Sequence, residues 1–207
     1  MSPYQPYRDS AADHLYHLLF ADDAQALAGN GGAARASWAR VLVAPEADPV
    51  ALRALAAAPD TESRVAAAAW RRLQAEGHEV PRRQLLGVVI EVPLESGLDT
   101  LAVYRDGSVR FIHGSGHATL VEGPEPTLQP LVQRLLAASQ AVVDRIGPSE
   151  HPRGAPPQRN VRLNFIVSDG LYFGEGPMNA LMNDALAGPV LMAGVAILDR
   201  VTGMVAA

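Results

Sequence analysis

The first 82 residues carry apolar side chains at helical spacing. Leu15, Leu18 and Leu19 recur on one face of a predicted helix, for which Ser10 or Asp13 can supply the cap. The segment DDAQALAGNGG predicts a short helix that ends at its glycines and asparagine, whereas the segment ARASWARVLVA is ambiguous. This part of the chain is therefore predicted to be mainly helical.

The clearest helices of this region form a pair. The first begins with Asp48 as N-cap and Pro49 at the first helical position, and the second begins at Asp60 and ends at Gly77. The apolar stripe of the second helix consists of Val65, Ala69 and Leu73, with Trp70 beside it. Because a helical repeat array needs several such pairs and only one is recognisable, we interpret the pair as part of a cap packed on the rest of the chain.

At residue 85 the apolar period changes from that of a helix to that of a strand. Residues 85–122 are rich in β-branched side chains and contain the turn signal Asp106-Gly107, which predicts a four-stranded antiparallel meander. A helix over 127–146, a hairpin over 160–175 and helices over 177–205 are predicted to follow. The helix over 127–146 has an apolar stripe made of Leu131, Leu135, Ala138, Val142 and Ile146.

This order of elements predicts an α+β protein. Residues 1–82 form the helical region, or cap, and residues 83–207 form an α+β sandwich in which an antiparallel β-meander sheet has helices packed on one face. The last helix, over 189–205, is apolar nearly all round, which indicates deep burial or a place in an oligomer interface. We expect burial between the sheet and the helical cap, with a homodimer through this helix as the alternative.

Composition narrows the chemistry that the chain can perform. All 17 basic residues are arginine, so no lysine exists to form a Schiff base or a phosphate-binding P-loop, and the absence of cysteine excludes thiol catalysis and disulfides. The net charge of −5 gives no basic field for nucleic acid. The abundance of alanine, glycine and arginine is typical of a bacterial protein from a GC-rich genome.

No targeting or membrane segment is expected from the sequence. The N-terminus lacks the basic start and apolar run of a signal peptide. The longest apolar run, over 187–198, stops at Asp199 and is shorter than the roughly 18 residues that a membrane span needs. We therefore expect a soluble cytoplasmic protein without a membrane or nucleic-acid partner.

The stretch FIHGSGHATLVEG places two histidines around a glycine-rich turn. If Gly114-Ser115-Gly116 is a three-residue loop, His113 faces His117 at the rim of the sheet, and Gly116 takes the left-handed conformation. Two histidines are half of a zinc site, and no third ligand follows from the spacing, so we expect neither a metal nor a cofactor. A simple turn is the favoured interpretation, because a phosphate-binding loop leads into a helix and this one joins two strands.

The stretch SDGLYFGEGP is the second candidate site. Its Asp169-Gly170 pair predicts a hairpin turn, and Glu175 is expected to satisfy the free amides of the helix that follows. The residues expected to bind a ligand or a partner are His113, His117, Asp169, Tyr172 and Glu175.

The sequence favours a non-catalytic protein-interaction or regulatory module with a protein partner, because no catalytic motif is present and loops on a rigid sheet are where binding occurs. The alternative is a small-molecule-binding protein or minor hydrolase whose site lies between the His113/His117 hairpin and the Asp169–Glu175 hairpin. That alternative requires the two hairpin tips to lie at the same end of one sheet.

Overall fold

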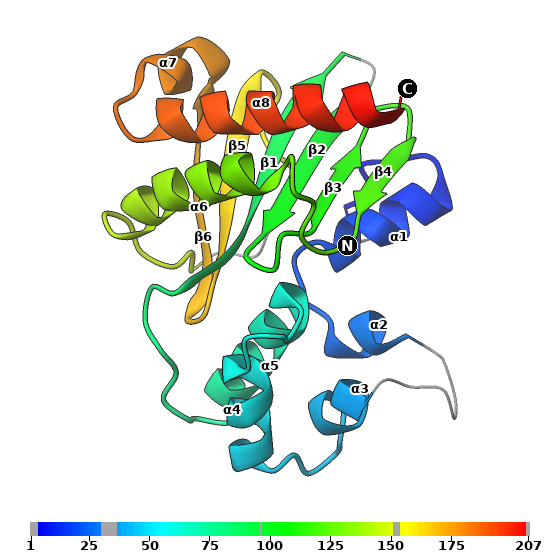
Figure 1. The fold of residues 1–207 in the computed structure, drawn as a ribbon, viewed down its shortest axis with the longest axis vertical. Helices are drawn as coiled ribbons and strands as arrows, with labels where there is room; N and C mark the ends of the chain where they lie inside the picture. The colour runs from blue at the N-terminus through cyan, green and yellow to red at the C-terminus, as the bar shows by residue number, and fades with distance from the viewer. Residues whose placement is uncertain (1–3, 30–36, 96, 151–153, 206–207) are drawn as a thin grey trace.

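The predicted α+β architecture is confirmed. The computed structural model describes residues 4–29, 37–95, 97–150 and 154–205. Over these ranges it contains eight helices and one six-stranded antiparallel sheet with the strand order β4-β3-β2-β1-β5-β6 (Figure 1). The strands are β1 (Leu85–Leu94), β2 (Gly97–Tyr104), β3 (Val109–Ile112), β4 (Ala118–Val121), β5 (Asn160–Val167) and β6 (Gly170–Pro177). The predicted meander and the later hairpin thus join into a single sheet around β1.

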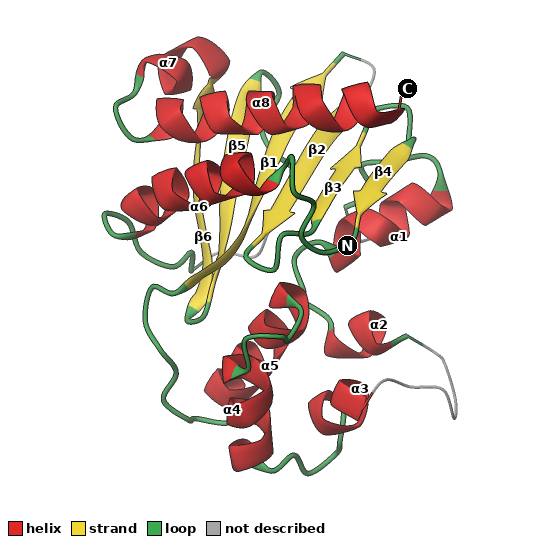
Figure 2. Ribbon diagram, in the orientation of Figure 1, coloured by secondary structure: helices red, strands yellow, loops and turns green. Residues whose placement is uncertain are grey.

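Two long helices cover one face of the sheet. They are α6 (Gln129–Val143) and α8 (Ala187–Val205), which run side by side across the strands, with the short α7 (Met178–Asn183) between β6 and α8 (Figure 2). The predicted stripe of α6 faces the sheet, because Leu135 and Val142 are buried and the other three members pack partly buried against the same core. The predicted helices and hairpin of this half of the chain are therefore confirmed.

The N-terminal helices lie on the opposite face. They are α1 (Ser10–Leu18), α2 (Ala24–Ala28), α3 (Ser37–Leu42), α4 (Pro49–Ala57) and α5 (Ser63–Ala75). Their buried side chains, such as Tyr16 and Phe20, share one hydrophobic cluster with Leu86 and Val89 of the sheet. The prediction that α8 lies between the sheet and the cap is therefore wrong: β-strand side chains alternate between faces, and the cap and α8 pack on opposite ones.

The helix caps agree with the sequence in part. Asp48 caps α4 with Pro49 at the helix start, as predicted, whereas α1 is capped by Asp9 in place of Ser10 or Asp13. α5 begins at Ser63, three residues after the predicted Asp60. Its cap comes from the β2–β3 turn, where Asp106 Oδ2 accepts from the Ser63 backbone N–H at 2.7 Å and the Asp106 backbone N–H donates to Ser63 Oγ at 3.0 Å.

A buried hydrogen-bond network fixes the N-terminal segment to the sheet. The Tyr16 hydroxyl donates to Glu91 Oε1 at 2.7 Å, and Asn164 Nδ2 donates to Glu91 Oε2 at 2.7 Å. All three side chains are at most 1% exposed. Nearby, the Tyr7 hydroxyl lies 2.8 Å from Thr100 Oγ1 and donates to the Leu98 carbonyl at 2.7 Å. Polar side chains thus hold α1 over β1 and β5 inside an otherwise apolar layer.

α8 resembles a membrane span in length and composition. Within the described residues it is the one helix that passes this test, over Ala187–Met204, with a mean hydropathy of 1.2 and 44% of the window buried. Its buried side chains, including Val190, Ile197 and Val201, belong to the core cluster against the sheet. A core helix of a soluble protein passes the same test, so the structure is compatible with a soluble protein.

Candidate functional site

The histidine hairpin has the predicted register. The His113 N–H donates to the His117 carbonyl at 2.8 Å, Phe111 pairs with Thr119, and Gly116 has φ +90°. Both histidines are exposed, and His113 Nδ1 lies 2.8 Å from Ser115 Oγ. The described residues contain no group of three or more His, Asp or Glu side chains that could hold a metal ion.

The second candidate tip differs from the prediction by one residue. Ser168 and Asp169 form the turn, and Gly170 already pairs with Val167 as the first residue of β6. Asp169 Oδ1 accepts from the Arg83 N–H at 3.1 Å, and Asp169 Oδ2 accepts from the Tyr172 hydroxyl at 3.1 Å. Burial, together with the Asp169 carboxylate, raises the pKa of Tyr172. These bonds hold Arg83 in the linker between α5 and β1, where its φ of +58° is unusual for a residue other than glycine.

The two hairpin tips lie at opposite ends of the sheet. Val167, beside the β5–β6 turn, pairs with Leu85 at the start of β1, whereas Ile112, beside the histidine turn, pairs with Thr100, which pairs with Glu91 near the end of β1. The expected site between the two hairpins is therefore not formed, because an antiparallel meander puts successive turns at alternating ends of the sheet.

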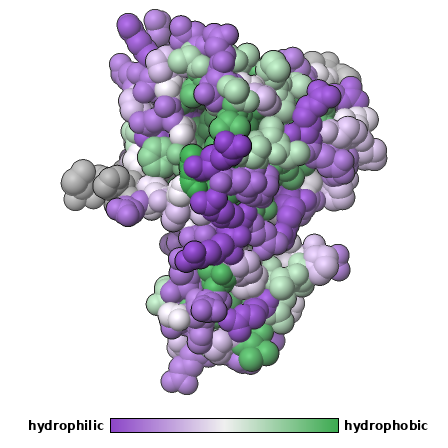
Figure 3. Space-filling model, turned by 90° about the vertical axis from the view of Figure 1, so that its left-hand side faces the viewer, coloured by the Kyte–Doolittle hydropathy of each residue, from purple (hydrophilic) through white to green (hydrophobic). Residues whose placement is uncertain are grey.

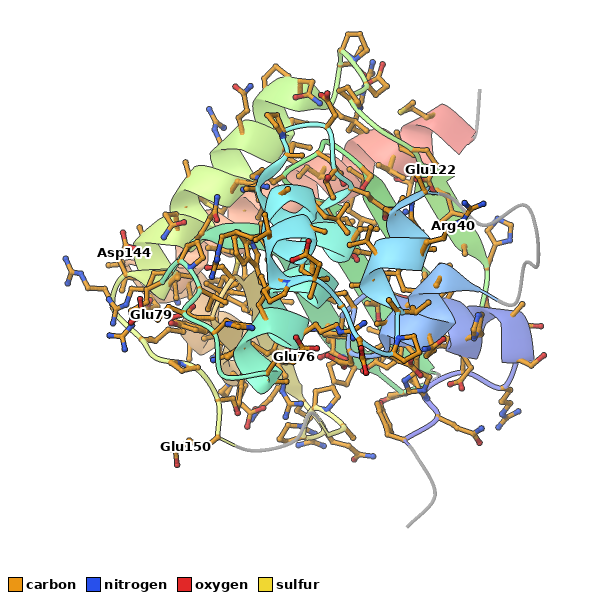
Figure 4. The ribbon with its side chains drawn as sticks, turned by 90° about the horizontal axis from the view of Figure 1, so that it is seen from below. Arg40, Glu76, Glu79, Glu122, Asp144 and Glu150 are labelled. Carbon is orange, nitrogen blue, oxygen red and sulfur yellow. The ribbon has the colours of Figure 1, made fainter. Side chains whose placement is uncertain are left out.

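Asp169 and Tyr172 instead line a cleft at the junction of sheet and cap. Its volume is about 670 Å³, and its other lining residues are Gln74, His78, Glu79, Val80, Arg82, Arg83 and Pro148. Figure 3 shows mainly hydrophilic side chains at the level where the sheet meets the cap helices. Seen from below, Glu79 and Asp144 lie on one flank, near the end of α6 (Figure 4). The Asp144 carbonyl accepts a hydrogen bond from Arg83 Nη1. Together with the bond between the Arg83 N–H and Asp169, this contact fixes the linker between α5 and β1.

Glu175 binds within its own sheet and does not cap α7. Glu175 Oε2 accepts from Arg162 Nη2 at 2.7 Å and from Arg162 Nε at 2.9 Å. The Arg162 guanidinium lies 5.1 Å from the centre of the Phe173 ring and also donates to the Gly154 carbonyl at 2.6 Å. The N-cap position of α7 is Pro177, which has no side-chain cap bond, so the expectation for Glu175 is wrong: the cross-strand arginine is the stronger partner.

A small apolar cavity lies between α8 and the sheet, and we call it the α8 socket. Its volume is about 190 Å³. The sheet contributes Ile90, Val92, Asp99, Leu101 and Phe111, and the helices contribute Met178, Leu191, Gly194, Val195 and Leu198. Gly194 brings α8 close to the sheet, because a Cβ at this position would lie 2.6 Å from Ile90 Cδ1. Apolar cavities of similar size, about 150 Å³, accept a benzene ring.

One carboxylate lines the α8 socket, and one histidine contacts a lining residue from outside it. Asp99 is the single ionisable residue among its lining residues, and its Oδ1 accepts from the Gly114 N–H at 2.7 Å. The ring of His113 meets the ring of Phe111 edge-on, with 6.3 Å between centres. The histidine hairpin is thus joined to the rim of this cavity, and Asp99 is a residue that sequence reasoning missed because it lies in a strand without a motif.

Exposed apolar side chains continue from the α8 socket over α7 and α8, and we call them the methionine surface. Its members are Met178 (40% exposed), Met182 (39%), Met192 (58%) and Val195 (51%). Met178 and Val195 belong to both features. Figure 3 shows hydrophobic side chains in the upper half of its view, the level at which Figure 1 places α7 and α8. Methionine is normally a core residue, so this outward placement departs from ordinary packing.

No protein-family model, curated protein or solved structure matches the chain.

Proposed function

We propose that the protein is a non-catalytic interaction module that binds an amphipathic helix of a partner protein on the methionine surface. The observation that supports this most directly is the exposure of four apolar side chains on two contacting helices, two of which line an open apolar cavity. Contiguous exposed apolar patches mark interaction sites, and flexible methionine side chains adapt to an incoming apolar face. We further propose that this interaction takes place in the cytoplasm.

Charge favours a basic partner over a second copy of this chain. Asp99 lines the α8 socket, Asp184 precedes α8, and the exposed Asp199 lies about one turn beyond Val195. Arg200 donates through Nε to Thr127 Oγ1 at 3.1 Å, which directs it towards α6. A two-fold contact would bring these acids near their own copies, whereas lysine or arginine beside the apolar face of a foreign helix would complement them.

A peptide titration tests the proposal. The probe is a short fluorescent helical peptide of leucine and lysine with leucine on one face, and its counterpart carries glutamate in place of lysine. We expect the leucine–lysine peptide to raise the fluorescence anisotropy with the wild-type protein and the M192D/V195D double variant to lose this binding. The matched control is Val50→Asp on α4, where an equally apolar side chain is 71% exposed on the cap.

The outcomes separate the proposal from its alternatives. Equal binding by the wild-type protein, the double variant and the Val50→Asp control would count against the methionine surface. Equal binding of the lysine and glutamate peptides would count against a basic partner. Sedimentation of the wild-type protein as a dimer that M192D/V195D dissociates would assign the surface to self-association and overturn the proposal.

A further inference from the structure

We infer that the α8 socket receives a single ring-sized or isobutyl-sized apolar side chain of the partner and that Asp99 pairs with a basic residue next to that anchor. This inference rests on the proposed function and names the chemistry of the partner segment. The α8 socket would select the one side chain that enters it, which we call the anchor. The broader methionine surface would supply the rest of the contact area.

The size of the recess sets the anchor. A volume of about 190 Å³ exceeds the roughly 150 Å³ that holds benzene in an apolar protein cavity and is below the roughly 300 Å³ at which pockets for drug-sized ligands begin. The floor is formed by Ile90, Leu101 and Phe111 of three adjacent strands, so the anchor meets only apolar atoms there. A leucine or phenylalanine side chain fits this description.

The carboxylate of Asp99, at the edge of the α8 socket, determines which residue type is favoured beside the anchor. Asp99 is half-buried, and the Gly114 N–H holds its Oδ1. Its Oδ2 accepts no hydrogen bond from the described part of the chain, and no arginine lines the α8 socket. A carboxylate in partly apolar surroundings is stabilised by an approaching cation. On a helix, a basic residue three or four positions from the anchor lies on the same face and can reach this carboxylate.

A partner protein fits the surroundings better than a free small molecule. The α8 socket opens beside Val195 and Met178, which belong to the methionine surface, so an anchor held in the recess continues into a larger apolar contact. Protein interfaces concentrate their binding energy in a few anchors that fill pockets, surrounded by contacts that exclude water.

Small-molecule probes test the recess without knowledge of the partner. Toluene, phenethylamine and phenylacetate share one ring and differ in charge, and their binding is followed by the methyl resonances of Ile90, Leu101 and Leu191. We expect methyl resonances of all three residues to shift and phenethylamine to bind about fivefold more tightly than phenylacetate, the ratio typical of a partly exposed ion pair.

The Asp99→Asn variant is the matched control, because an asparagine oxygen can still accept from Gly114. We expect it to keep toluene binding and to lose the preference for phenethylamine. Equal binding of phenethylamine and phenylacetate by the wild-type protein, or an unchanged preference in Asp99→Asn, would overturn the inference. Methyl shifts confined to residues outside the α8 socket would do the same.

The two proposals fail separately. If peptide binding requires Met192 and Val195 but the ring probes show no charge preference, the proposed function is supported and the inference about the α8 socket and Asp99 is wrong. If the ring probes behave as expected but the peptide does not bind, the inference about the α8 socket is supported and the proposed function is wrong.

Discussion

The Tyr16–Glu91 hydrogen bond allows a sharp test of the forces that hold α1 on the sheet. Tyr16→Phe removes one buried hydroxyl and leaves the ring, which packs edge-on against Tyr7 and Phe20. Tyr104→Phe is the matched control, because the Tyr104 hydroxyl is also buried and also donates at 2.7 Å, but to the backbone carbonyl of Leu19. The two variants therefore differ mainly in the acceptor that loses its donor.

The expected magnitudes follow from the chemistry of the two acceptors. Glu91 accepts one hydrogen bond on each oxygen, and the prediction takes it as an ionised acceptor, to which a hydrogen bond contributes about 1.5–3 kcal/mol. A bond to a neutral carbonyl contributes about 0.5–1.5 kcal/mol. We therefore expect Tyr16→Phe to lower the free energy of unfolding by about 1 kcal/mol more than Tyr104→Phe does.

The assay is urea unfolding followed by circular dichroism, with thermal unfolding as a second measurement. For a chain of this size, the 1 kcal/mol difference corresponds to about 2–4 °C in Tm. An unchanged urea dependence in both variants would show that the folded and unfolded states keep their compactness. Equal losses in the two variants would refute the reasoning, because they would mean that Glu91 acts as a neutral acceptor.

Three further predictions concern single positions. Burial raises the pKa of Asp106, but hydrogen bonds from Ser108 and Ser63 outweigh burial and lower the pKa below its ordinary value. The Asp106 carboxylate therefore stabilises the fold above about pH 3.9, and this contribution is lost as pH falls through the lowered pKa. The pH-dependent stability curves of the wild-type protein and Asp106→Asn should converge in acid. Asp169→Ala should lower the free energy of unfolding by about 1–2 kcal/mol, because the Arg83 N–H and the Tyr172 hydroxyl lose their acceptor, and should leave peptide binding unchanged in the anisotropy titration. Gly97→Ala should cost about 1–3 kcal/mol in urea unfolding, because its Cβ would collide with the Gly114 carbonyl, whereas Gly147→Ala meets open space and serves as the control.

Local patterns predicted those features that local chemistry decides. The register of the histidine hairpin follows from the size of its glycine loop, and the stripe of α6 follows from its period, so both could be derived from neighbouring residues. The cap of α5 could not be derived in this way, because Asp106 is 43 residues from Ser63 in the chain. The partner of Asp169 in the β5–β6 turn could not be derived locally either, because it is the distant Arg83.

The candidate site was only half predictable for a related reason. His113 stands out in the sequence because it flanks a glycine loop, whereas Asp99 and Leu101 look like ordinary strand residues until pairing places them beside Phe111. The expected site failed on strand order, which determines the end of the sheet at which each turn lies. Asp169 and Tyr172 stayed together because they are three residues apart on one hairpin.

The outer face of α8 gives stronger support for a binding role than the hairpin loops do. Covering the sheet requires apolar residues only on the inner side, where Val190, Ile197 and Val201 are buried. The same helix has polar residues outward near its end, at Asp199 and Thr202, so the protein tolerates them there. Folding alone therefore leaves the exposed Met192 and Val195 unexplained, and a partner that covers them would remove this apolar surface from water.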